Sequence, residues 1–345
     1  MSSLDTDFAA RARVLVTGAG GAAGIAVIRA LDEVVGDLHA GDCDRLATGL
    51  HLVAPDRRIL LPRGDDPWFA EHLASICVDR AINVVIPTVD EELIAVARAR
   101  EALERHGIIA LCPSTQALET CLDKHALMET LSHVAVAPQS ALLDEHFEPG
   151  AWEFPVAVKP RTGRGGRGFC VVDDAAGLDR MPHDGSLLVQ EYLPGAEYSV
   201  DVLVCSDGHV AAAVPRDRLR VDSGVAVVAC SLHDELLEDA AGECAREVGL
   251  RGPANVQLRR DRAGAPKLLE INPRFPGTVA LTIASGVDLP LLALADAMGE
   301  PIPEDAGTFE PVGIVRMLAE TVVPVAELVD GVPPRAGRAA PSLHT

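Results

Sequence analysis

A carboxylate, an amide and an arginine alternate in the segment LEINPR, residues 269–274. The segment is typical of a β-strand, on which side chains two residues apart point to the same face. Glu270 and Asn272 would therefore face one site together, and Gln257 would join them from the neighbouring strand of a predicted hairpin. Carboxylate and amide oxygens suit Mg²⁺ bridging phosphates, and Arg274 would stabilise a transferring phosphoryl group. The alternative is an ordinary solvent-exposed sheet face.

Two lysines and a glycine-rich loop form a second group that suits phosphate chemistry. Lys124 lies in or at the start of a predicted helix, and Lys159 ends a predicted strand four residues before the loop GRGGRG, residues 163–168. The grouping is notable because only 30 of the 345 residues are Lys or Arg. Such a loop can lie over phosphates, with backbone N–H groups and arginine side chains facing the charge. Taken alone, the loop is equally typical of a plain hairpin turn.

A third group follows a predicted strand over residues 187–191. The strand runs into Pro194 and Gly195, and a strand that ends in this way presents backbone N–H and C=O groups that an adenine edge can use. Glu197 comes just after the turn, where its carboxylate could accept hydrogen bonds from ribose hydroxyls. The segment therefore predicts a nucleoside-binding edge.

A glycine-rich turn near the N-terminus, TGAGGAAG over residues 17–24, supports a competing interpretation. It follows a predicted strand and opens a predicted helix, so its backbone N–H groups could approach a phosphate. Gly18, Gly21 and Gly24 have the spacing found in short-chain dehydrogenases. The turn therefore indicates an NAD(P)-dependent oxidoreductase as an alternative function.

The catalytic half of the oxidoreductase interpretation is missing. Asp42 or Asp44 could accept ribose hydroxyls at the end of the second predicted strand, but those enzymes also need a tyrosine with a lysine four residues later. Neither of the two tyrosines, Tyr192 and Tyr198, has a lysine at that position. The open alternative is that the glycines allow a strand and a helix to pack tightly, with no dinucleotide bound.

Residues 13–112 alternate short β-rich runs with helical ones, an order that predicts βαβ units and a parallel sheet. Strands are expected over residues 14–17, 37–42, 58–61, 83–87 and 108–112, and helices over 22–34, 68–77 and 91–106.

The rest of the chain predicts a mixed α+β arrangement. Helices are expected over 114–131 and 234–248, single strands over 156–159, 169–173 and 187–191, and antiparallel pairs over 198–205 with 209–214 and 255–260 with 267–271. The predicted domain boundaries are 1–113, 114–190 and 191–330, with a flexible tail over 331–345.

Composition limits the kind of protein. Asp and Glu number 51 against 30 Lys and Arg, so the net charge of −21 disfavours nucleic acid and membrane surfaces as partners. The eight cysteines form no C-x-x-C pair, which is typical of reduced thiols in a cytoplasmic protein. No export signal is evident at the N-terminus. The apolar stretch 279–298 is interrupted by charged residues and a proline, so we expect no membrane span there.

Taken together, the two lysines, the glycine loop, the strand-to-turn segment and the Glu-x-Asn-x-Arg segment resemble the ATP-grasp superfamily. The most similar branch contains the synthetase halves of carbamoyl-phosphate synthase large chains and stand-alone carboxylate–amine ligases. The resemblance covers about residues 110–300 for the grasp itself, and the first domain resembles the one that precedes it in those enzymes. It implies a Rossmann-like α/β domain followed by an α+β ATP-grasp fold with a mobile lid.

The resemblance also implies roles for individual residues. Lys124 and Lys159 would contact the α- and β-phosphates of ATP, and Lys159 and Arg274 would be the catalytic residues, with Arg274 at the γ-phosphate and then at an acyl phosphate. The other implied roles are Gly165 and Gly166 in the loop that covers ATP, Glu191 and the backbone of Leu193 at adenine, Glu197 at ribose, and Gln257, Glu270 and Asn272 as ligands of Mg²⁺, for which Mn²⁺ could substitute.

The implied activity is that of a carbon–nitrogen ligase. A substrate carboxylate attacks the γ-phosphate to give an acyl phosphate and ADP, and an amine then displaces phosphate to form an amide. The partners would be small-molecule carboxylates and amines of amino-acid type, and a homodimer is compatible with this function. A module that holds ATP without catalysis is a further alternative.

Two short segments supply candidate substrate-binding residues. The segment PRDRLR, residues 215–220, is locally cationic, so Arg218 or Arg220 could bind a second carboxylate if the segment is more than a solvated loop. Asp90 or Glu91 follows a strand of the first domain, where α/β sheets place ligands, and could hold an ammonium group. Glu91 is as typical of an ordinary acidic first turn of a helix.

Overall fold

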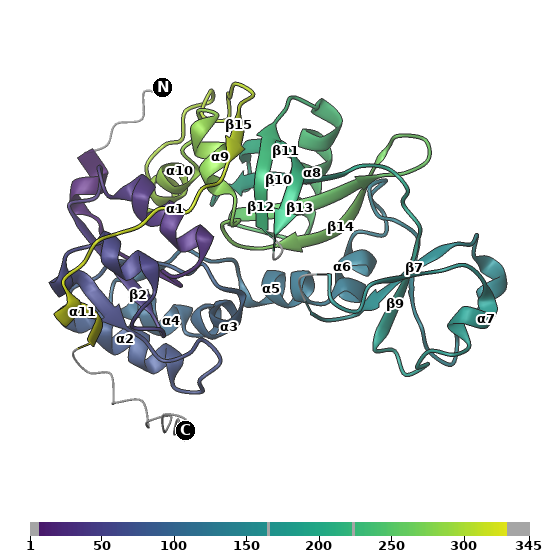
Figure 1. Ribbon diagram of the computed structural model, residues 1–345, viewed down its shortest axis with the longest axis horizontal. Helices are drawn as coiled ribbons and strands as arrows, with labels where there is room; N and C mark the ends of the chain where they lie inside the picture. The colour runs from purple at the N-terminus through teal and green to yellow at the C-terminus, as the bar shows by residue number, and fades with distance from the viewer. Residues whose placement is uncertain (1–6, 164–165, 223–224, 330–345) are drawn as a thin grey trace, which may run out of the picture.

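Alternating apolar strands and helices build a parallel sheet in the computed structural model, which describes residues 7–163, 166–222 and 225–329 (Figure 1). Its strands are β1 (Arg13–Thr17), β2 (Asp37–Asp42), β3 (Arg58–Leu60), β4 (Val84–Ile86) and β5 (Ile109–Ala110), in the order β3-β2-β1-β4-β5. Every neighbouring pair is parallel. The strand order reverses between β1 and β4, so their carboxyl ends flank a switch point, where open α/β sheets bind ligands.

Helices pack on both faces of this sheet. The apolar side chains of β1 point alternately to the two faces, so each face can form a core with helices. Val14 and Val16 lie in one core with α1, whereas Leu15 lies in another core with α2 and α3. The helices are η1 (Asp7–Arg11), α1 (Ala22–Leu31), η2 (Thr48–Leu52), η3 (Pro55–Arg57), α2 (Phe69–Asp79), α3 (Asp90–Arg98) and α4 (Arg100–Arg105). The helix predicted over 91–106 is thus two helices. The second begins at Arg100. Its side chain donates a hydrogen bond to the carbonyl of Pro113, beyond β5, at 3.2 Å.

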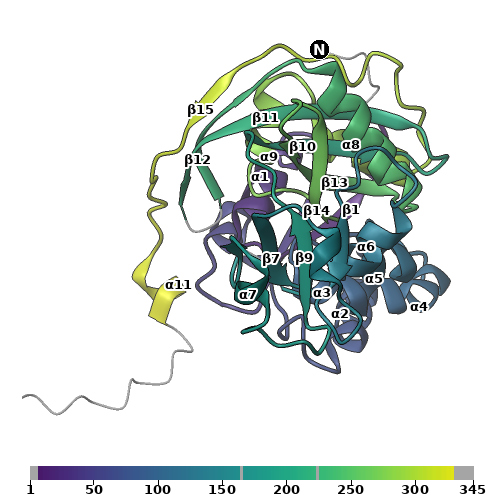
Figure 2. The same ribbon diagram turned by 90° about the vertical axis from the view of Figure 1, so that its right-hand side faces the viewer.

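A four-stranded antiparallel sheet follows. Its strands are β6 (Ser140–Leu142), β9 (Leu187–Glu191), β7 (Val156–Pro160) and β8 (Cys170–Val172), in that order, with η4 (Pro149–Ala151) and α7 (Ala175–Leu178) beside it. The short strand β6 is not among the predicted strands. Figures 1 and 2 both place this sheet next to the β14 edge of the larger sheet described below.

The helix predicted over 114–131 is broken by a capping aspartate. It forms α5 (Thr115–Leu122) and α6 (Lys124–Thr130), and Asp123 caps α6 by accepting from the backbone N–H groups of His125 and Ala126 at 3.0 and 3.2 Å. Arg161 holds the same carboxylate through its Nε at 2.8 Å. The cap therefore places Lys124 at the first residue of a helix rather than in its middle.

The last part of the chain forms a six-stranded sheet in the order β14-β13-β10-β11-β12-β15. The strands are β10 (Glu197–Val204), β11 (Val210–Asp222), β12 (Val225–Ser231), β13 (Gly252–Arg260), β14 (Pro266–Asn272) and β15 (Gly313–Val315), and the helices are α8 (Glu235–Glu247), α9 (Val279–Ala284), α10 (Leu289–Ala297) and α11 (Val325–Val329). β11 runs eight residues past its predicted end, because β12 pairs with its second half.

The two faces of this sheet differ sharply in polarity. Val200 and Val256 lie in the core that packs under α8. On the opposite face, the ladder aligns Ser199 with Gln257 and Glu270, and Asp201 with Asn255 and Asn272. The period of two along each strand therefore gathers the polar side chains on one surface.

Helix α1 joins the first domain to the six-stranded part through one apolar core. Val27 and Ile28 of α1 belong to the same buried cluster as Val279 of α9 and Leu292 of α10. The C-terminal segment then returns to the first domain, where Arg58 and Glu327 form an ion pair at 2.6 Å. Within the described residues, no helix has the length and apolar character needed to span a membrane.

Candidate nucleotide and metal site

The three predicted metal ligands lie in adjoining positions on the polar sheet face. Gln257 pairs directly with Glu270 in the β13–β14 ladder, and Asn272 Nδ2 donates to Glu270 Oε1 at 3.3 Å. One carboxylate and two amides supply oxygens of the kind that Mg²⁺ prefers, with phosphate and water completing its coordination. Among the described residues no three His, Cys, Asp or Glu side chains are grouped so that they could hold a metal ion, so a metal here would depend on these amides and on the nucleotide.

Lys159 reaches this site from the four-stranded sheet. A register shift between β13 and β14 leaves Leu269 outside the ladder, and its carbonyl accepts a hydrogen bond from Lys159 Nζ at 3.0 Å. The same Nζ donates to Gln190 Oε1 at 3.0 Å. Burial lowers the pKa of Lys159 to about 8, an effect that Glu270 opposes and Lys124 increases. A phosphate would restore the charge that burial disfavours.

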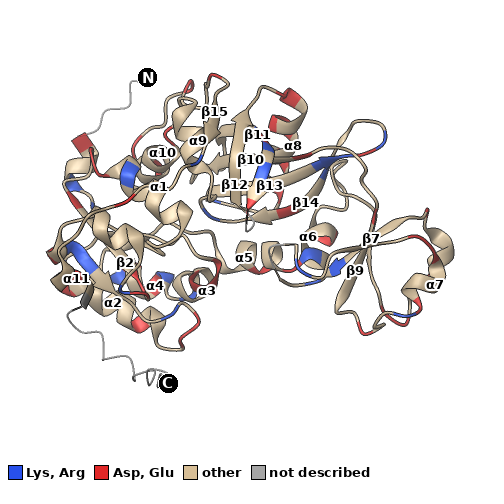
Figure 3. Ribbon diagram, viewed as in Figure 1, with Lys and Arg blue, Asp and Glu red and all other residues tan. Residues whose placement is uncertain are grey.

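Lys124 provides a second ammonium group beside the glycine loop. Its Nζ donates to the carbonyl of Gly163 at 2.7 Å, and the side chain is largely buried. Gly166 has a φ of +67° and open space around its Cα, whereas Gly165 lies outside the described residues. Cationic residues lie at α6 and beside β9 in Figure 3. The structure thus brings both lysines and the described part of the loop together.

The two glutamates predicted to hold the nucleoside have protein partners. Glu191 Oε1 accepts from the backbone N–H of Gln139 at 3.2 Å, and Leu193 is buried. Glu197 accepts from Arg218 at 2.8 Å and from Arg259 at 3.0 Å. Ribose would therefore compete with two arginines for Glu197.

The four substrate candidates fall in three different places. Arg218 is bound to Glu197 as above, and Arg220 lies exposed on β11 opposite Val228. Asp90 forms an ion pair with Arg274. Glu91 lines a cavity in the first domain. The structure therefore brings Asp90 to the predicted catalytic arginine, whereas Arg220 lies on an exposed part of β11.

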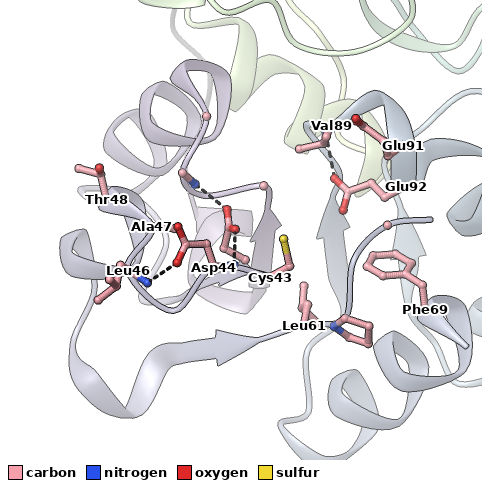
Figure 4. A pocket seen from close by; sticks show the side chains of 16 residues that line it. Cys43, Asp44, Leu46, Ala47, Thr48, Leu61, Phe69, Val89, Glu91 and Glu92 are labelled. Carbon is pink, nitrogen blue, oxygen red and sulfur yellow. Dashed lines mark hydrogen bonds between the residues drawn. The ribbon is translucent and has the colours of Figure 1, made fainter. Parts of the chain in front are cut away.

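The cavity occupies about 470 Å³ at the carboxyl edge of the parallel sheet. Figure 4 shows Cys43 and Asp44 on one side and Glu91 and Glu92 on the other. Glu92 is buried, and burial raises its pKa to about 7, although hydrogen bonds from Thr17, Val89 and Thr88 oppose the shift. Glu92 was not predicted from the sequence, because an acid in a first helical turn carries no sign of burial.

The glycine turn packs tightly against its own fold. A Cβ on Gly18 would lie 2.2 Å from Val89 Cγ2, and one on Gly24 would lie 2.4 Å from the Gly18 oxygen. The backbone N–H of Gly20 donates to Asp42 Oδ2 at 2.7 Å. These contacts favour the packing interpretation of the glycines over a dinucleotide site.

A buried polar network beneath the site also escaped the sequence analysis. Asp201 forms an ion pair with Arg216 and accepts from Asn255 at 3.0 Å and Thr282 at 2.6 Å. The aspartate within the otherwise apolar strand VDVLV, residues 200–204, was the available signal. Its partners come from three other elements and cannot be assigned from spacing.

Two family models match the chain. One is described as "ATP-grasp in the biosynthetic pathway with Ter operon" and matches residues 183–321, and the other is described as "PylC-like, N-terminal domain" and matches residues 14–111.

Curated relatives and a solved structure agree with these matches. The chain is 28% identical over 251 residues to the carbamoyl phosphate synthase arginine-specific large chain of Bacillus subtilis, covering 67% of this chain and 24% of the relative. It is 33% identical over 183 residues to carnosine synthase 1 of Gallus gallus, covering 44% and 20%. An L-amino acid ligase from Bacillus licheniformis has a similar structure, with a TM-score of 0.68, 18% identity and coverage of 88% of this chain and 79% of the ligase.

Residues 183–321 are therefore of the ATP-grasp type. The first domain is of the PylC-like N-terminal type. The predicted fold, a parallel α/β domain followed by antiparallel ATP-grasp sheets, is confirmed. The chain spans about a quarter or less of the length of the two curated relatives, and the lid role of loop 163–168 stays a prediction.

Proposed function

We propose that the protein is an ATP-dependent carboxylate–amine ligase that forms an amide through an acyl phosphate and releases ADP and phosphate. One observation carries the proposal. Lys159, from the four-stranded sheet, contacts β14 of the six-stranded sheet beside Glu270, which lies in a row with Gln257 and Asn272. Cations from one side and oxygen ligands from the other suit the phosphates of ATP. The ATP-grasp match over residues 183–321 supports the same reaction class.

The protein would act mainly by positioning and by stabilising charge. Lys124 and Lys159 would donate to the inner phosphate oxygens, and Arg274 would meet the charge that develops on the γ-phosphoryl group. Gln257, Glu270 and Asn272 would hold Mg²⁺ or Mn²⁺. The ion, when bound, supplies Lewis-acid stabilisation of the phosphates. Loop 163–168 would close over the site and exclude water, which would otherwise hydrolyse the acyl phosphate.

The amine substrate would lie toward the first domain, where the cavity is acidic. Asp42, Asp44, Glu91 and Glu92 line it together with apolar residues such as Phe69. Carboxylates of this kind favour an ammonium group. The names of two similar proteins, a carnosine synthase and an L-amino acid ligase, support amino-acid-like substrates, so we extend that class to this chain.

Nucleotide choice separates this function from the oxidoreductase alternative. Mg²⁺-ATP is expected to stabilise the protein against thermal unfolding, by about 2.7 kcal/mol at a concentration of 100 Kd. NAD and NADP are expected to have no effect, because the Gly20 N–H that a diphosphate would need is bonded to Asp42. The measurement is a thermal denaturation series with each nucleotide. Stabilisation by NAD and not by Mg²⁺-ATP would restore the oxidoreductase interpretation.

Product analysis tests the reaction class. With a suitable acid and amine, ATP is expected to yield ADP and phosphate, because Arg274 and the metal ligands would stabilise charge on the transferring γ-phosphoryl group while Lys124 and Lys159 would neutralise the inner phosphates. Hydroxylamine in place of the amine is expected to trap a hydroxamate of the acid. Screening pairs of amino acids for phosphate release would identify the substrates. AMP as the stoichiometric product would contradict the phosphoryl-transfer role of Arg274 and Lys159, and binding of ATP with no turnover across the screen would favour a non-catalytic module.

A further inference from the structure

A carboxylate from the first domain holds the guanidinium of Arg274. Arg274 Nε donates to Asp90 Oδ1 at 2.5 Å, and Nη2 donates to Asp90 Oδ2 at 2.9 Å. This bidentate arrangement fixes the plane of an arginine side chain. The two side chains are 20% and 16% exposed, so water and salt screen the pair less than an ion pair on the open surface.

Arg274 keeps donors for a ligand while it is bound in this way. A guanidinium carries five N–H groups. Asp90 takes two of them, and the carbonyl of Phe275 accepts a third, from Nη1, at 3.2 Å. Within the described ranges, one N–H on each Nη atom has no protein acceptor. A phosphoryl oxygen would use these two donors.

The backbone that carries Asp90 is itself fixed. The buried carboxylate of Glu92 accepts from the N–H groups of Thr88 and Val89 at 3.0 and 3.1 Å and from Thr17 Oγ1 at 2.7 Å. Asp90, at the start of α3, is thereby anchored to the end of β1. An anchored carboxylate can orient a longer and more flexible arginine.

We infer that Asp90 is a positioning residue, which orients Arg274 toward the transferring phosphoryl group from the opposite domain. The inference rests on the proposed function and gives the first domain a part in phosphoryl transfer. It also replaces the predicted role of Asp90 as a ligand for a substrate ammonium group, because Arg274 engages both of its oxygens. Loss of Asp90 would leave the cation in place and disturb only its direction.

The test compares the binding of MgADP with that of MgADP plus aluminium fluoride, which mimics the transferring phosphoryl group. Wild-type protein is expected to bind the mimic at least about 100-fold more tightly than MgADP, as calorimetry would measure. Asp90→Asn is expected to lose roughly 10- to 100-fold of this gain while binding MgADP as wild type does. Asp90→Glu, which keeps the charge, is expected to recover part of it.

Steady-state kinetics distinguish a positioning role from a purely structural one, because the loss of a purely structural ion pair would not lower kcat selectively. Asp90→Asn is expected to lower kcat with little change in the KM for ATP, because ATP binding does not need the orientation of Arg274. Glu327→Gln is the matched control. It breaks the Arg58–Glu327 pair, which also ties a later segment to the first domain and is similarly exposed, at 20% and 27%. Its kcat is expected to be normal.

The outcomes separate the two proposals. A wild-type protein that gains nothing from aluminium fluoride would overturn the proposed function and this inference with it. If folded Asp90→Asn keeps the full gain in affinity that aluminium fluoride gives, the inference is overturned and the proposed function is not. The same holds if Glu327→Gln loses as much kcat as Asp90→Asn does. If Asp90→Asn does not fold, Asp90→Ser is judged by the same criteria.

Discussion

Glu270→Gln is expected to fold normally and to lose ATP turnover by roughly 100- to 1,000-fold. Glu270 is the only carboxylate in the row with Gln257 and Asn272, so the substitution removes the negative charge that would balance a divalent ion. The side chain keeps its size and its place opposite Gln257, which is why the fold is expected to survive. Steady-state phosphate release and thermal denaturation measure the two effects separately.

The control for this variant is a glutamate outside the site. Glu153 is exposed and pairs only with Arg262 among the described residues, so Glu153→Gln is expected to retain turnover. Near-normal activity in folded Glu270→Gln would show that the three-residue row does not hold the metal.

Lys159→Met is expected to weaken Mg²⁺-ATP binding by roughly 10- to 100-fold, because it removes a charge-assisted contact from a buried position. The thermal stability is expected to fall little or to rise. The lowered pKa of Lys159 shows that burial disfavours its ionised form, and methionine removes that cost. Calorimetric titration with Mg²⁺-ATP and thermal denaturation check the two expectations.

The same lysine gives binding and folding a pH dependence. Its pKa falls from 10.5 to about 8 in the folded protein, so between these values the unfolded chain holds a proton that the folded chain has lost. Folding stability from this group therefore rises as the pH rises through this interval. Binding follows the opposite sign, because phosphates need the charged amine: affinity for Mg²⁺-ATP is expected to fall above about pH 8.

Proton uptake isolates this effect. At pH 8.5, binding of Mg²⁺-ATP to wild type is expected to take up a fraction of a proton, which titrations in buffers of different ionisation enthalpy would reveal. Lys159→Arg is the matched variant, because arginine stays charged at this pH, and it is expected to take up less. Equal uptake by the two proteins would mean that Lys159 is not the group that titrates.

The local pattern of the sequence predicted that Gln257, Glu270 and Asn272 lie side by side, whereas the contacts that these residues make with other segments depend on the fold. The period of two along a strand was enough to pair Glu270 with Asn272, and the hairpin brought Gln257 opposite them. The register shift that frees the Leu269 carbonyl for Lys159 has no sign in the sequence, because either strand could carry the extra residue.

The ion pairs between side chains of distant segments could not be predicted from spacing. Asp90 and Arg274 are 184 positions apart, and each has an ordinary local explanation, the first as an acid at a helix start and the second as a strand-end cation. The ion pair between Arg218 and Glu197 is a similar case. From the sequence, Arg218 was expected to bind a substrate carboxylate and Glu197 was expected to bind ribose. Spacing shows which residues share an element, whereas pairing between elements depends on how they pack.

The carboxylate of Asp42, a side chain of the protein itself, occupies the position at the glycine turn where an anionic ligand would bind. It accepts from the backbone N–H groups of Gly20 and Asp44 at 2.7 and 2.9 Å. As a tethered competitor it is present at an effective concentration that a free phosphate seldom reaches, and Glu91, which lines the same cavity, adds a repulsive field. From these charges we expect ligands to separate by sign, with phosphates binding near Lys124 and Lys159 and cations binding toward the first domain.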